Sequence, residues 1–91
     1  VSHLEKILFY DPLSVDAYAE LGYIYHVRRD HKQAINYFER VIYLDPERLE
    51  VYYLLAYNYL KLDQQELAKL VLEVLQEKRP DSTIDALLKT F

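Results

Sequence analysis

The three prolines of the chain recur at a fixed interval. Pro12, Pro46 and Pro80 stand about 34 residues apart, which is a known period of helical repeats. The same slots between consecutive prolines hold the same kind of residue: Tyr18, Leu21, Gly22, Tyr25, Ala34 and Phe38 in the first interval, and Tyr52, Leu55, Ala56, Tyr59, Ala68 and Leu72 in the second. Such a period predicts repeated units, each of which buries its apolar face against its neighbours.

The spacing of apolar residues within a unit predicts two packed helices. Tyr18, Leu21 and Tyr25 fall at i, i+3 and i+7, which is one face of a helix. We interpret Gly22, the small residue that follows Leu21, as the point where the two helices approach closely. Phe38 of the second helix then fills the gap between them. Each proline ends a unit, because proline lacks an N–H and crowds the preceding turn.

The repeated residues also match a known signature. The first unit reads Y-x2-L-G-x2-Y, then A-x3-F, then P, and resembles the tetratricopeptide repeat, with Tyr18 where that family usually has Trp. In the second unit Ala56 replaces Gly and Leu72 replaces Phe, and both still suit the size of the slot. The resemblance implies an all-α, right-handed solenoid of helical hairpins, with two full repeats and partial flanking helices.

The repeat frame predicts the organisation of the chain. Four segments follow from it: the carboxyl-terminal half of a preceding repeat (1–14), two repeats (15–48 and 49–82), and a capping or truncated helix (83–91). We expect helices over residues 15–28, 31–44, 48–62 and 64–78. N-caps or capping-box spacings precede the helices at Ser14, Asp30, Asp63 with Glu66, and Ser82 with Asp85.

The two ends of the chain depart from the full unit. Near the carboxyl end Lys89 and Thr90 occupy the Leu-Gly slots, and the apolar residues form a stripe of their own: Ile84, Leu87, Leu88 and Phe91. A helix that covers the open end of the stack is typical of terminal units. At the other end Val1 stands in mid-register and the chain has no Met, so we interpret the sequence as a fragment of a longer protein.

Composition and missing motifs exclude several functions. A net charge of −4 argues against a nucleic-acid surface, and no apolar run approaches the ~18 residues of a membrane span. The absence of cysteine is compatible with a reducing compartment, so we expect a cytoplasmic protein. His26 and His31 are expected at the surface beside a turn, and no histidine pair has metal-ligand spacing. No catalytic motif or phosphate loop occurs, so we expect no enzyme, cofactor or metal site.

The first helix of each unit has a second face that should be polar but is not. At about 100° per residue, ten residues fall opposite the packing face: Asp16, Ala19, Glu20, Tyr23 and Val27, then Glu50, Tyr53, Leu54, Tyr57 and Lys61. An apolar second face needs cover from a ligand or a neighbouring helix. The resemblance implies that these residues line a concave groove, and the alternative is that part of the face packs against neighbouring repeats.

These features predict an adaptor or scaffold that binds another protein. Its partner would place a peptide segment or a short helix in the groove, and the acidic Asp16, Glu20 and Glu50 favour basic or neutral residues beside apolar anchors. Two other functions stay open. One is a self-association module that forms a homo-oligomer, and the other is an accessory segment of a larger enzyme.

Overall fold

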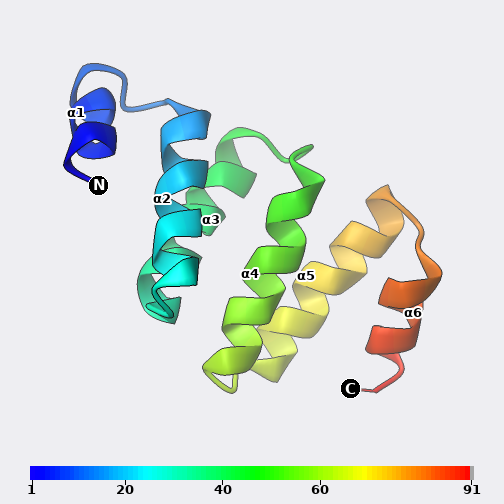
Figure 1. Cartoon of the computed structure of the whole chain (residues 1–91). Helices are drawn as coiled ribbons and strands as arrows, with labels where there is room; N and C mark the ends of the chain where they lie inside the picture. The colour runs from blue at the N-terminus through cyan, green and yellow to red at the C-terminus, as the bar shows by residue number, and fades with distance from the viewer. Residues whose placement is uncertain (91) are drawn as a thin grey trace.

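The computed structural model describes residues 1–90 of the chain, and this part consists of six helices and no strand. Figure 1 shows the helices following one another across the molecule, with the two termini at opposite ends. Their bounds are α1 Ser2–Tyr10, α2 Val15–Val27, α3 His31–Leu44, α4 Leu49–Lys61, α5 Gln65–Lys78 and α6 Ser82–Leu88.

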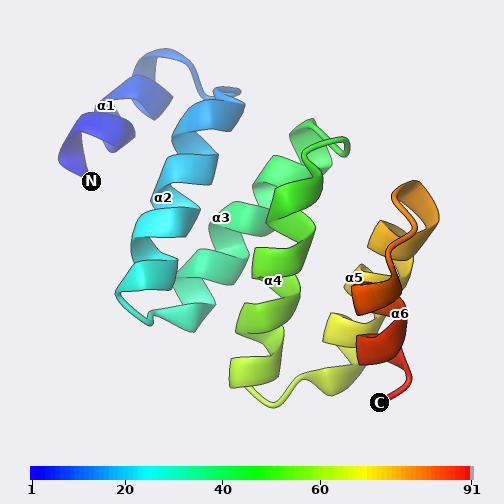
Figure 2. The same ribbon diagram turned by 45° about the vertical axis from the view of Figure 1, so that its right-hand side comes forward.

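The helices pair into successive hairpins. α2 packs against α3 and α4 packs against α5, while α3 also packs against α4 and so joins the two hairpins. α1 contacts α2 at one end, and α6 contacts α5 at the other. Figures 1 and 2 both show α2 and α4 side by side. The described chain is elongated, with extents of 42 × 24 × 16 Å. The predicted all-α solenoid of helical hairpins is confirmed.

The core lies in the interfaces between successive helices. A large cluster is formed by buried residues from α2 to α6, and a small one holds α1 against α2 through Leu4, Ala17 and Leu21. The largest fully buried apolar side chains are Phe38, Leu21 and Val41. Burial of one such side chain contributes roughly 1.5–3 kcal/mol, so the repeated slots account for much of the stability.

The two small-residue slots are filled differently. A Cβ atom placed on Gly22 would lie 2.6 Å from two ring carbons of Phe38, which is closer than real Cβ contacts. The second hairpin has Ala56 at this slot, opposite the smaller Leu72, and both are buried. The extra methyl group of Ala56 is therefore compensated by the smaller side chain of Leu72, which stands where the first hairpin has the ring of Phe38.

The first residue of the signature also fixes the turn before it. The hydroxyl of Tyr18 donates to the carbonyl of Pro12 at 2.9 Å, and one period later Tyr52 donates to Pro46 at 2.7 Å. The sequence pattern explained tyrosine here only as a packing residue. The structure shows that its hydroxyl ties each first helix to the loop that enters it.

Two of the four predicted helix N-caps are confirmed, and the other two are wrong. Ser14 and Asp30 accept from the amides of Ala17 and Gln33. Gln64 precedes α5 without a side-chain bond, because Asp63 instead belongs to the end of α4. Asp81, one residue before the predicted cap Ser82, accepts from the amide of Thr83 at 2.7 Å. Phe91, the last member of the predicted apolar stripe, lies outside the described residues.

The turns inside the two hairpins share one geometry. Arg29 and Asp63 have left-handed backbones, with φ of 62° and 58°. Around each, two amides bond back to the preceding helix: Asp30 N to Tyr25 O and Arg29 N to His26 O in the first turn, and Gln64 N to Tyr59 O and Asp63 N to Leu60 O in the second. This is the Schellman motif, in which glycine usually takes the left-handed position.

Candidate functional site

The ten predicted groove residues lie on two adjacent parallel helices. Five are on α2 and five on α4, which contact each other directly. The large apolar members are only partly covered: Tyr23 is 55 % exposed, Tyr53 43 % and Tyr57 44 %. Ala19 and Leu54 differ from the rest because they are half-buried and pack against the core. The face therefore presents aromatic side chains to its surroundings above two half-buried aliphatic residues.

One end of this face is an acidic hollow of about 520 Å³. It is lined by Asp16, Ala19, Glu20, Tyr23, Ile24 and Arg48. Arg48 forms an ion pair with Asp16 across the two helices, and this hydrogen bond raises the pKa of the guanidinium above its ordinary value. The charge of Asp16 is therefore already matched, whereas Glu20 and Glu50 belong to none of the ion pairs found in residues 1–90.

The opposite end of the face is a basic hollow of about 350 Å³. It is lined by Tyr23, His26, Val27, Arg29, His31, Tyr57 and Lys61. Lys61 Nζ lies 5.2 Å from the centre of the Tyr57 ring, a cation–π distance. Tyr57 also meets His26 edge to face, with ring centres 5.4 Å apart. Tyr23 and Tyr57 thus line one hollow from different helices.

A buried amide organises the floor of this hollow. Asn58 has no exposed surface, and its Nδ2 donates to the carbonyl of Leu54 at 2.8 Å and to His26 Nδ1 at 2.9 Å. Its Oδ1 accepts from His31 Nδ1 at 2.7 Å. The prediction that His26 and His31 are surface residues is therefore wrong. Both are half-buried, because Asn58 of the second hairpin holds them from the first.

The sequence carried a signal for Asn58. Val51, Leu55 and Asn58 fall at i, i+4 and i+7, so the amide stands in a buried stripe, and Ile24 occupies the same slot one period earlier. A polar residue in such a stripe needs hydrogen-bond partners. Its partners were unpredictable, since they lie in the other hairpin.

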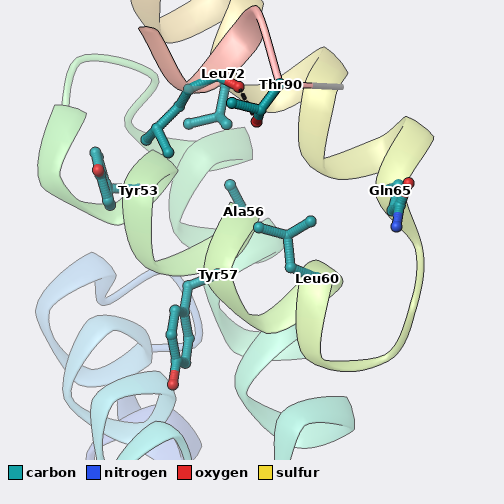
Figure 3. Close-up of a pocket in the computed structure, with 8 residues that line it drawn as sticks. Tyr53, Ala56, Tyr57, Leu60, Gln65, Leu72 and Thr90 are labelled. Atoms are coloured by element: carbon teal, nitrogen blue, oxygen red, sulfur yellow. Dashed lines mark hydrogen bonds between the residues drawn. The ribbon is translucent and has the colours of Figure 1, made fainter. Parts of the chain in front are cut away.

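An apolar pocket of about 420 Å³ adjoins the face on its other side. It is lined by Tyr53, Ala56, Tyr57, Leu60, Gln65, Leu72, Leu87 and Thr90, from α4, α5 and the last turn of the chain. Figure 3 shows Tyr53 and Tyr57 projecting from α4 on the side away from Gln65. The two tyrosines are shared with the predicted groove. The other lining residues were not predicted, because they come together only where α6 follows α5.

The most exposed apolar side chains lie elsewhere. Phe9, Tyr10, Leu13 and Tyr43 are between 69 % and 87 % exposed, on α1, the loop after it and α3. Phe9 and Tyr43 occupy the same slot of successive units. None of these four residues belongs to the predicted groove.

Between residues 1 and 90 no group of three or more His, Cys, Asp or Glu side chains is placed to hold a metal ion. None of the helices there is both long and apolar enough to cross a membrane.

The family model of the tetratricopeptide repeat matches residues 26–89, which is more than half of the chain. No curated protein matches the chain.

Proposed function

Because the chain belongs to the tetratricopeptide repeat family, whose repeats generally mediate protein–protein interaction, we propose that its α2–α4 face binds a segment of another protein. Repeats of this family are typically non-enzymatic interaction modules. The chain therefore acts as an adaptor or scaffold.

One observation carries the choice of this face. Tyr23, Tyr53 and Tyr57 are roughly half exposed on adjacent helices, and they line the hollows at the two ends of the face and the apolar pocket beside it. Half-exposed tyrosines suit binding, since a large rigid ring loses little rotamer entropy and its hydroxyl stays wet. The apolar pocket would take the anchor side chain of the partner.

The size of the face limits the partner segment. From residue 50 to residue 61, α4 rises about 1.5 Å per residue and so spans about 16 Å. That length accommodates about five residues of extended chain or three turns of helix.

A peptide library displayed on phage and selected on the wild-type chain tests the proposal. The selected peptides should bind a Tyr23→Ala, Tyr57→Ala double variant at least about tenfold more weakly, because each truncation removes a central anchor. A Tyr43→Ala variant serves as control, since Tyr43 is exposed on another side. Circular dichroism must show that all variants stay helical. Peptides that bind the double variant as well as wild type would refute the proposal.

A second candidate function is self-association. It is favoured by two pairs of exposed apolar side chains, since the rings of Phe9 and Tyr10 contact each other and Leu13 and Tyr43 line one hollow. Exposed apolar side chains that gather on a surface mark interaction sites. Light scattering over a concentration series should then show a dimer that a Phe9→Lys, Tyr43→Lys variant reduces to monomer. A monomer at every concentration excludes this function.

A further inference from the structure

The basic hollow has no acidic partner of its own. Arg29 and Lys61 are its formal cations, and no carboxylate lines it. Neither residue takes part in the ion pairs of residues 1–90, which join Arg48 to Asp16 and Asp45, Lys78 to Glu47, and Lys89 to Asp85. The hollow therefore holds two positive charges with no carboxylate of the described chain beside them.

The walls of the hollow hold these charges in place. The ammonium of Lys61 lies against the face of the Tyr57 ring, which attracts a cation electrostatically. The backbone of Arg29 stands in the left-handed turn between α2 and α3, at the rim of the hollow. Aromatic walls also lower the local dielectric, so a charge that enters here is screened less than in open water.

His26, on the floor of the hollow, adds an uncharged hydrogen-bond donor. Since Leu54 O can only accept, Nδ2 of Asn58 is the donor on that side, and its second hydrogen goes to His26 Nδ1. Nδ1 of His26 is therefore unprotonated, and the proton of the ring is on Nε2. His26 can donate this N–H to a group in the hollow.

We propose that the basic hollow binds a carboxylate side chain, from an aspartate or glutamate of the protein segment that occupies the face. This inference rests on the proposed function and adds a charge requirement to it. At the other end of the face Glu20 and Glu50 belong to none of the ion pairs of residues 1–90, so a basic residue of the segment complements them there. The partner segment therefore carries an acidic and a basic residue about 16 Å apart, on the rise of α4 between residues 50 and 61.

A purely structural role predicts something else. Arg29 and Lys61 stand at the ends of α2 and α4, where positive charge offsets the negative end of the helix dipole. In that case their replacement would change stability alone and would not change the binding of any anion at this hollow.

The test is an NMR titration of the ¹⁵N-labelled chain with N-acetyl-glutamate amide. Saturable shifts are expected at Arg29, His26 and Lys61, and the uncharged N-acetyl-glutamine amide should not produce them. An Arg29→Asn, Lys61→Gln variant should bind the glutamate probe about fivefold to tenfold more weakly; asparagine tolerates the left-handed turn. The matched control is Lys32→Gln, Lys69→Gln, which removes two exposed cations elsewhere and should leave binding unchanged.

Several outcomes would overturn the proposal. Equal shifts with the glutamine probe, unchanged binding by the Arg29→Asn, Lys61→Gln variant, or binding of inorganic phosphate without binding of the glutamate probe would each do so. The phage-selected peptides keep this result separate from the proposed function. If they depend on Tyr23 and Tyr57 but bind equally well after Arg29→Asn and Lys61→Gln, only the carboxylate assignment fails.

Discussion

At the scale of single residues, the two hairpins solve one packing problem in two ways. Gly22 lies under the ring of Phe38, and Ala56 lies opposite the smaller Leu72. Cores tolerate substitution best when the total volume is kept. Each hairpin therefore carries a matched pair, and the members of the pair should not be exchangeable one at a time.

The matched pair can be tested with a double-mutant cycle. Gly22→Ala should lower the free energy of unfolding by about 1–2 kcal/mol, because overpacking against Phe38 exceeds the gain in helix propensity. Gly22→Ala with Phe38→Leu, which recreates the second hairpin, should be at least about 1 kcal/mol more stable than the sum of the two single changes predicts. Urea unfolding measures all four proteins. Additive effects would contradict the matched pair.

Tyr59 makes the stability of the folded chain depend on pH in the alkaline range. Burial, followed by the charge and hydrogen bond of Glu39, raises the pKa of Tyr59 from 10.0 to about 12. The unfolded chain thus loses this proton first, so the contribution is complete below about pH 10 and is lost as the pH rises toward 12. Between these pH values the midpoint temperature of thermal unfolding should fall less steeply for Tyr59→Phe than for wild type. Parallel curves would contradict this.

At the scale of helices, the hairpin turns keep a strained backbone. Arg29 and Asp63 take the left-handed position of a Schellman motif, where a side chain with a Cβ costs about 1–2 kcal/mol relative to a right-handed residue. Aspartate is several-fold enriched in the left-handed region, and arginine is not. The first turn is therefore the more strained of the two.

Replacement by glycine should show that strain directly. Arg29→Gly is expected to raise the free energy of unfolding by about 0.5–1 kcal/mol, because glycine adopts positive φ without a steric cost. Arg28→Gly is the matched control, since Arg28 has φ of −75° and the same charge, and it should destabilise the chain. Urea unfolding of both variants decides the matter. A loss of stability in Arg29→Gly as large as in Arg28→Gly would exclude strain at Arg29.

At the scale of the whole molecule, one buried amide connects the two hairpins. Asn58 of α4 bonds to His26 of α2 and His31 of α3, while α3 packs against α4 along its length. In a solenoid, stability is approximately the sum of unit and interface contributions. A change at Asn58 should therefore weaken the interface rather than either hairpin.

Asn58→Ala is expected to cost about 2–3 kcal/mol, because it removes three hydrogen bonds and leaves a cavity. Asn36→Ala, at an exposed position of α3, should stay within about 0.5 kcal/mol of wild type. Hydrogen exchange should show faster opening at the α3–α4 boundary in Asn58→Ala. Faster opening confined to α5 and α6 would contradict the role given to Asn58.

The sequence by itself determined the periodic part of this protein. The prolines, the small-residue slots and the apolar spacing predicted two helical hairpins with partial flanking helices, because these features act within one unit or between identical neighbours. The same periodicity placed Tyr23 and Tyr57 on corresponding faces, and the match to the tetratricopeptide repeat confirms the family.

Only the tertiary structure decided what is not periodic. Asn58 departs from the repeat, and its partners lie in the other hairpin, so no spacing within one unit could identify them. The predicted N-cap of α5 was wrong, because Asp63 takes a left-handed conformation that the Schellman turn of α4 imposes. The basic hollow likewise exists only where the ends of α2 and α4 meet. A repeat pattern fixes which residues are equivalent, whereas contacts between units depend on the residues that differ.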